Sequence, residues 1–330
     1  MLTFDCWKTR YLWIRLGVSI LHASAAFVLC ATVFTSRVTA EEDNPRVSVP
    51  TRIQPHEQTV SRSGLLRSRV NLVLIPATVT DLLERPVKGL TQANFRVFDG
   101  GVEQKIIEFF SEDAPASVSM LFDASGSMRK KIDQSRMALT DFLQMSTPGD
   151  EFSLLKFSDR PEPLCPFTTN IGQIEDNLAS IQSGGWTSLF DAIYVAMRRM
   201  KLATHGTKAL FVLSDGGDNN SRYTETEVRE AVRETDVRIF AISIFNRASA
   251  LERISAESGG RTYEVHKLSE LPEMAATLSA EIHSHYVLGY SAPNDSNDGK
   301  YHKVVVKVVP PPGSPRLRIA WRRGYYAPLR

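Results

Sequence analysis

The chain has 330 residues, of which 42% are hydrophobic and 23% are charged, and its formal net charge is +2. This is the composition of an ordinary globular protein with one large domain or two smaller ones. The first forty residues carry four Lys or Arg and one acid, and the remainder holds 35 basic and 36 acidic groups. The small basic excess therefore belongs to the leader, and the composition does not indicate a nucleic-acid-binding protein.

Residues 1–40 have the pattern of a secretory signal peptide. Basic residues precede an apolar stretch, LGVSILHASAAFVLCATVF, and Val38 and Ala40 occupy the small-residue positions expected before a cleavage site. We expect cleavage after Ala40 and a secreted, periplasmic or cell-envelope location. The alternative is an uncleaved membrane anchor, because the apolar run is long enough to cross a bilayer. Cleavage leaves only Cys165, so we expect no intramolecular disulfide and no cysteine-based metal site, and interpret Cys165 as a small apolar residue.

The next two segments differ sharply in composition. Residues 41–67 are polar and rich in Pro, Arg and Ser without any period, which predicts a flexible linker. Residues 68–115 are rich in β-branched residues and contain the turn signal Asp99-Gly100-Gly101 between two strand-like runs. This segment is therefore predicted to be a small β module.

Residues 116–284 alternate between short apolar runs and amphipathic segments. The strand candidates are SVSMLF, EFSLLKF, KALFVLS, VRIFAISIF and RTYEV. The helical patterns cover residues 131–145, 174–181, 188–202, 226–235, 248–258 and 270–284. This alternation predicts an α/β fold in which a doubly wound, mostly parallel sheet is covered by helices on both faces.

Residues 285–330 return to β structure. HYVLGYSA, KYHKVVVKVV and RLRIAWRR alternate apolar and polar residues, as half-buried strands do. Neither this tail nor the 68–115 module is large enough to bury much core alone. We expect the two to pack together as a β-sandwich-like module.

Three of the predicted loops in residues 116–284 are rich in oxygen-bearing side chains. Asp123, Ser125 and Ser127 follow the first strand, Thr187 follows a double glycine before a helix, and Asp215 ends another strand. Ligands of doubly wound sheets bind at the carboxyl ends of the strands, where these loops should meet. Oxygen ligands suit Mg²⁺, Mn²⁺ or Ca²⁺, and we expect one divalent cation, Mg²⁺ first. No G-x-x-x-x-G-K-[ST] loop is present, so no nucleotide is expected.

DASGS, Thr187 and SDGGD together resemble the metal-ion-dependent adhesion site (MIDAS) of von Willebrand factor type A domains. The resemblance covers residues 116–284 and implies direct metal contacts from Ser125, Ser127 and Thr187. It implies that Asp123 and Asp215 act largely through water or hold the hydroxyls, and that a partner's Asp or Glu fills the open metal position. The flanks resemble those of the acidobacterial-type von Willebrand factor A-related group, which implies an immunoglobulin-like flank.

Several nearby residues have simpler interpretations. Trp186 stands where many type A domains pass directly from glycine to threonine, and it is either an exposed contact for a partner or a ring packed over the loop. We interpret Asp191 as a buried or helix-facing carboxylate and Asp218 as a turn residue. His283 and His285 lack supporting ligands for zinc and are expected at the surface or at a junction.

Three functions remain open from the sequence. The first is a secreted or envelope-associated adhesion-type module that captures an acidic residue of a protein partner through the metal. The second is an envelope scaffold or assembly factor in which the metal stabilises the fold. The third and weakest is a metal-dependent hydrolase, because Ser125 lies in no G-x-S-x-G motif; we therefore predict that the chain is not an enzyme. The last helix, at residues 270–284, would be the element that moves if the site switches between open and closed states.

Overall fold

The computed structural model describes residues 72–330, except 113, 246–247, 293–297 and 330. The predicted signal peptide and the predicted linker, residues 1–40 and 41–67, therefore lie outside the described residues. Residues 66–330 form one compact unit, which contains every helix and strand discussed below.

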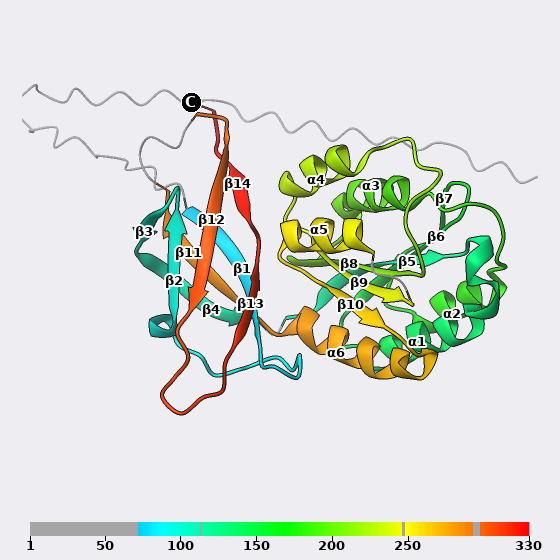
Figure 1. Cartoon of the computed structure of the whole chain (residues 1–330), viewed down its shortest axis with the longest axis horizontal. Coiled ribbons are helices and arrows are strands. Elements are labelled where there is room, and N and C mark those ends of the chain that lie inside the picture. The colour runs from blue at the N-terminus through cyan, green and yellow to red at the C-terminus, as the bar shows by residue number, and fades with distance from the viewer. Residues whose placement is uncertain (1–71, 113, 246–247, 293–297, 330) are drawn as a thin grey trace, which may run out of the picture. The chain divides into compact units, whose positions relative to one another are not determined.

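A six-stranded sheet forms the centre of the α/β part of the chain (Figure 1). Its strand order is β10-β9-β8-β5-β6-β7, and all neighbours are parallel except β6 and β7. The bounds are β5 Ala116–Asp123, β6 Glu151–Phe157, β7 Pro161–Thr168, β8 Thr207–Ser214, β9 Arg238–Ile244 and β10 Thr262–Val265. The predicted mostly parallel α/β fold is confirmed. Every residue of β5, β8 and β9 except Lys208 is buried, as expected for strands covered on both faces.

The antiparallel edge strand β7 was not predicted as a strand. Its sequence, PEPLCPFT, contains three prolines, which cannot donate hydrogen bonds to a sheet and normally argue against a central strand. At an edge only one side of the strand is paired, so prolines are tolerated there. Cys165 in this strand is a free cysteine only 2% exposed, which confirms its apolar interpretation.

Six α-helices lie near the six predicted positions. Their bounds are α1 Ile132–Gln144, α2 Ile171–Ser180, α3 Leu189–Arg199, α4 Glu225–Arg233, α5 Ser249–Ser258 and α6 Leu271–His283. Short 3-10 turns occupy η1 Gln92–Asn94, η2 Gly126–Lys130, η3 Met200–Leu202 and η4 Leu268–Glu270. In Figure 1, α1, α2 and α6 cover one face of the sheet and α3, α4 and α5 cover the other. The sheet is therefore doubly wound, with one apolar core on each face.

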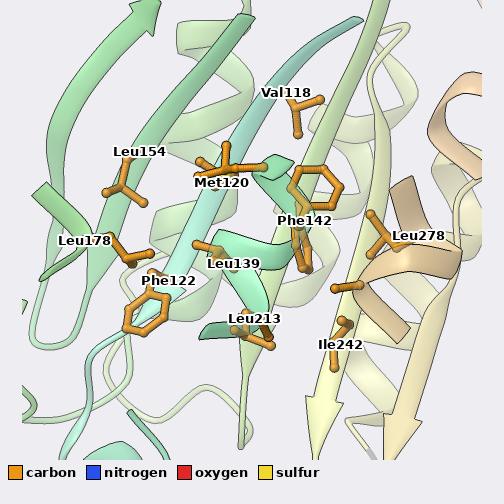
Figure 2. Packing of buried hydrophobic residues seen from close by; sticks show 14 of the residues in the cluster. Val118, Met120, Phe122, Leu139, Phe142, Leu154, Leu178, Leu213, Ile242 and Leu278 are labelled. Atoms are coloured by element: carbon orange, nitrogen blue, oxygen red, sulfur yellow. The ribbon is translucent and has the colours of Figure 1, made fainter. Parts of the chain in front are cut away.

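Alternate residues of β5 supply the two cores. Val118, Met120 and Phe122 point to the side of α1, as Figure 2 shows, whereas Leu121 belongs to the opposite cluster. Phe142 of α1 packs over this face, and its ring centroid lies 4.8 Å from that of Phe211. These buried contacts hold β5 rigidly, and its carboxyl end carries the first oxygen-rich loop.

The remaining strands form two four-stranded antiparallel sheets with orders β13-β1-β11-β4 and β14-β12-β2-β3. The bounds are β1 Leu72–Thr80, β2 Phe95–Asp99, β3 Val102–Gln104, β4 Ile106–Glu112, β11 His285–Ser291, β12 Tyr301–Val308, β13 Arg318–Trp321 and β14 Gly324–Tyr326. The hairpin turn predicted at Asp99-Gly100-Gly101 is present, with both glycines at positive φ. In each sheet, strands that precede the α/β part pair with strands that follow it, which explains why neither flank forms a core by itself.

Candidate functional site

Asp123 is the last residue of β5 and is fully buried. Its Oδ1 accepts a hydrogen bond from the Ser125 backbone N–H at 2.8 Å, and its Oδ2 accepts one from the Ser214 hydroxyl at 2.6 Å. Ser214 ends the neighbouring strand β8, so the carboxylate fastens the ends of two adjacent strands to each other. Asp123 thereby fixes the turn that carries the two site serines.

A chain of hydrogen bonds links three of the predicted site residues. The hydroxyls of Ser125 and Ser127 lie 3.1 Å apart, and Ser127 Oγ donates to Asp215 Oδ1 at 2.8 Å. Asp215 follows β8 directly and is 2% exposed. Lys131 Nζ donates to Asp215 Oδ2 and forms an ion pair with it. We call Asp123, Ser125, Ser127, Thr187 and Asp215 the oxygen cup.

The loop before α3 reaches the same edge through its backbone. Gly126 N–H donates to Gly185 O at 3.0 Å, and Gly184 N–H donates to Ala124 O at 2.8 Å. Gly185 has φ +81°, a conformation that glycine adopts without a steric penalty. The predicted double glycine is therefore needed for the turn that brings residues 184–187 against the first loop.

Thr187 is tied to the third loop and is 5% exposed. Its N–H donates to Asn219 Oδ1 at 2.7 Å, and its carbonyl oxygen accepts from the Asn219 N–H at 3.0 Å. Within the described part of the chain, the Thr187 hydroxyl has no hydrogen-bond partner. Its oxygen is not one of the fully buried, unpartnered polar atoms of the described residues, so a ligand can reach it.

Two buried carboxylates, Asp123 and Asp215, lie near each other in the cup, and their negative charges repel each other. Burial raises the pKa of Asp123, and the negative charge of Asp215 raises it further, while hydrogen bonds from Ser125 and Ser214 oppose the rise. A carboxylate with a raised pKa has its charged form disfavoured. A cation in the cup would relieve this cost.

The donor chemistry of the cup fits a hard divalent cation. Among the described residues, no group of three or more His, Cys, Asp or Glu gathers into a metal-binding cluster. A metal in the cup would meet hydroxyl and carboxylate oxygens, which suit Mg²⁺, Mn²⁺ or Ca²⁺ better than zinc or copper. Thr187, Ser125 and Ser127 supply such oxygens, and Asp123 and Asp215 supply charge.

A cavity of about 750 Å³ lies away from the cup. Its lining includes Thr207 and Arg238, the first residues of β8 and β9, whereas the cup lies beyond the last residues of β5 and β8. A pocket of this size takes organic ligands rather than a single ion. The cavity therefore lies at the amino-terminal ends of the parallel strands, and the cup lies at their carboxyl ends.

The residues near the oxygen motifs in the sequence lie outside the cup itself. Trp186 is 64% exposed, which decides in favour of the exposed interpretation. Asp191 accepts backbone hydrogen bonds from residues 222 and 223, and Asp218 accepts hydrogen bonds from Ser221, so both stabilise a turn rather than the cup. His283, the last residue of α6, and His285, the first residue of β11, are both buried where the helix passes into the strand.

Sequence reasoning missed Lys131 and Asn219 as neighbours of the cup. Ser214 follows from its place beside Asp215 at a strand end. Lys131 was assigned to a predicted helix, and the 3-10 turn η2 instead places it as the residue before α1. The sequence contains no signal for the Asn219 contact, because it depends on how the third loop folds back.

The family model of the von Willebrand factor type A domain matches residues 118–277. Residues 118–277 form a von Willebrand factor type A domain. The resemblance expected from the oxygen motif is therefore confirmed. Domains of this type typically mediate metal-dependent protein interactions through a MIDAS site.

Two curated relatives are inter-alpha-trypsin inhibitor heavy chains. The human heavy chain H4 is 30% identical over 175 residues, covering 47% of this chain and 19% of the relative. The Bos taurus heavy chain H4 is 28% identical over 278 residues, covering 77% of this chain and 29% of the relative. The chain thus spans less than a third of the length of either relative.

Solved structures with the type A fold are also similar to this chain. The von Willebrand factor type A protein from Catenulispora acidiphila has a TM-score of 0.47 and 12% identity, covering 70% of this chain and 76% of that one. Proximal thread matrix protein 1 from the mussel byssus, solved with a zinc-occupied MIDAS motif, has a TM-score of 0.44 and 16% identity, covering 56% of this chain and 49% of that one. In the described residues of the present chain, no helix is long and apolar enough to cross a membrane.

Proposed function

We propose that this chain is a metal-ion-dependent binding module that captures an acidic residue of a protein partner. One divalent cation, Mg²⁺ in the first place, is held by the hydroxyls of Ser125, Ser127 and Thr187. Asp123 and Asp215 act on the cation largely through water or hold the hydroxyls in position. The observation that carries this proposal is the Ser125–Ser127–Asp215 chain of hydrogen bonds at the same end of the sheet as Thr187, whose hydroxyl has no hydrogen-bond partner within the described residues.

The charge of the cup supports a partner of acidic character. When bound, the cation supplies a Lewis-acid position that accepts a partner's carboxylate. Neutral hydroxyl ligands leave most of the positive charge of such a cation uncancelled. Arg129 and Lys130, exposed on η2 beside Ser127, have no recorded ion pair within the described residues and add further positive charge. An acidic segment of a protein is therefore the favoured ligand.

Trp186 supports an apolar contact next to the acidic one. The ring stands 64% exposed at the residue before Thr187. Its backbone N–H donates to Asp159 Oδ1 at 2.8 Å, which fixes the loop without covering the side chain. Exposed tryptophans are enriched among the residues that dominate protein interfaces. We propose that the partner presents an apolar side chain near its Asp or Glu.

The same proposal places the protein in the secreted or envelope fraction and assigns it no catalysis. The location rests on the signal-peptide pattern of residues 1–40. The hydrogen-bond partners recorded for the Ser125 and Ser127 hydroxyls are each other and Asp215, with no histidine among them in the described part of the chain. We therefore assign the two hydroxyls to cation binding rather than to nucleophilic catalysis.

The decisive experiment is calorimetric titration of Mg²⁺ and Mn²⁺ into the metal-stripped protein, followed by capture of proteins from the extracellular or envelope fraction with and without metal. Ser125→Ala and Asp215→Ala should remove saturable metal binding. Ser180→Ala, a matched change on α2 away from the cup, should leave it unchanged. Metal-dependent capture that Glu- or Asp-rich peptides inhibit would support the module.

Two other results would change the conclusion. Metal that raises the melting temperature but leaves partner capture unaffected would favour the scaffold function. Saturable metal binding that survives both substitutions would show that the cation binds elsewhere.

A further inference from the structure

Lys131 is a cationic side chain in direct contact with the oxygen cup. It is the residue between the turn η2 and helix α1. Its ammonium group forms an ion pair with Asp215, and the two side chains are 17% and 2% exposed. The pair is therefore largely removed from water, where a charge–charge contact is screened least.

A second contact holds the ammonium group at this place. Lys131 Nζ lies 5.2 Å from the centroid of the Phe245 ring, within the range of a cation–π interaction. Phe245 follows β9 and has φ +66°, an uncommon backbone conformation for a residue with a bulky side chain. The adjacent Lys130 is exposed and makes no such contacts among the described residues.

We propose that Lys131 is a built-in competitor of the divalent cation and sets the metal affinity of the cup. This inference rests on the proposed function, because it concerns the same site. Asp215 is the carboxylate that Lys131 neutralises and also the one that the cation requires. Two cations held beside one carboxylate repel each other, so metal binding is expected to displace the ammonium group from Asp215.

Lys131 therefore links the stability of the metal-free protein to the affinity of the cup for metal. Without metal, Lys131 offsets the negative charge of a carboxylate that is only 2% exposed, and so it stabilises the fold. With metal, the free energy needed to displace the ammonium group is subtracted from the binding free energy of the cation. The lysine therefore weakens metal binding while protecting the metal-free protein.

The test compares Lys131→Met with Lys130→Met, two adjacent lysines of which only the first contacts Asp215. Mg²⁺ and Mn²⁺ are titrated calorimetrically into each metal-stripped protein, and melting temperatures are recorded with and without excess metal. Lys131→Met should tighten metal binding on the order of 10- to 100-fold, the range expected for loss of a charged hydrogen bond. It should also lower the melting temperature without metal, and Lys130→Met should do neither.

A double mutant separates the ion pair from other effects of the substitution. In an Asp215→Asn background the lysine has no carboxylate to neutralise, so Lys131→Met should no longer lower the melting temperature of the metal-free protein. A loss of the same size in both backgrounds would overturn the proposal.

The titrations distinguish this inference from the proposed function. If the unsubstituted protein binds metal and Lys131→Met binds it equally or more weakly, the competitor role is wrong and the metal site stands. If neither protein binds metal, the competitor role and the proposed metal site both fail.

Discussion

His285 couples the stability of this protein to acid. It is the first residue of β11 and is 5% exposed, and the Arg238 guanidinium lies 3.3 Å from its Nδ1. Burial, reinforced by the positive charge of Arg238, lowers the pKa of His285 to about 2. The imidazole therefore stays neutral in the folded protein at pH values where an unfolded chain would protonate it.

The sign and size of the effect follow from this difference. An unfolded histidine titrates near its model value of 6.5, so below that pH the unfolded state binds one proton more than the folded state. The contribution of His285 to the free energy of unfolding is fully present above the unfolded pKa. It declines as the pH falls, by about 1.4 kcal/mol per pH unit well below that pKa. From pH 6.5, where the unfolded histidine is half protonated, to pH 4.5, His285 alone should lower the free energy of unfolding by about 2.3 kcal/mol.

His283, two residues earlier, acts in a different window. Burial disfavours its charged form, but hydrogen bonds to Asp150 and to the Ser279 carbonyl, together with the negative charge of Asp150, outweigh burial and raise the pKa of His283. The contribution of His283 to the free energy of unfolding is therefore fully present below the unfolded pKa of 6.5 and is lost as the pH rises through the folded-state pKa. The two histidines do not mask each other, because their windows lie on opposite sides of pH 6.5.

The measurement is urea unfolding of the metal-stripped protein at half-unit steps from pH 4.5 to 7.5, with His285→Gln beside it. Glutamine offers Arg238 an acceptor and does not titrate, so the difference between the two curves isolates His285 from the carboxylates. His266→Gln, at an exposed position, is the control and should follow the unsubstituted protein. If the free energy of unfolding changes with pH equally in the unsubstituted protein and in His285→Gln between pH 4.5 and 6.5, the reasoning is refuted.

Three further predictions concern packing and recognition. Phe142→Ala should lower the free energy of unfolding by about 3–5 kcal/mol, since Phe142 is 1% exposed, whereas Met137→Ala on the solvent side of α1 should change it little in denaturant unfolding. Gly260→Ala would place a Cβ atom 2.1 Å from a backbone carbonyl oxygen and should cost about 2 kcal/mol or more, whereas Gly217→Ala meets nothing within 4 Å and should melt normally. Trp186→Ala should leave the free energy of unfolding within about 0.5 kcal/mol but weaken partner binding in the same capture assay.

The sequence by itself determined the fold class and the content of the cup. Apolar runs such as those of β5, β8 and β9 are buried on both faces, and such runs indicate strands of a covered parallel sheet whatever surrounds them. The oxygen-rich residues Asp123 and Asp215 could be placed at one edge because parallel strands end together. Alternation in β12 likewise indicated its buried face, which contains Val304 and Val306.

Tertiary structure alone decided the contacts that join distant segments. The edge position of β7 made its prolines acceptable, and no local pattern records whether a strand lies at an edge. The pairing of Lys131 with Asp215, 84 residues away, arises because η2 turns the chain before α1 begins. Local propensity and periodicity act over a few residues, whereas the charge balance of the cup depends on loops brought together by packing of the sheet.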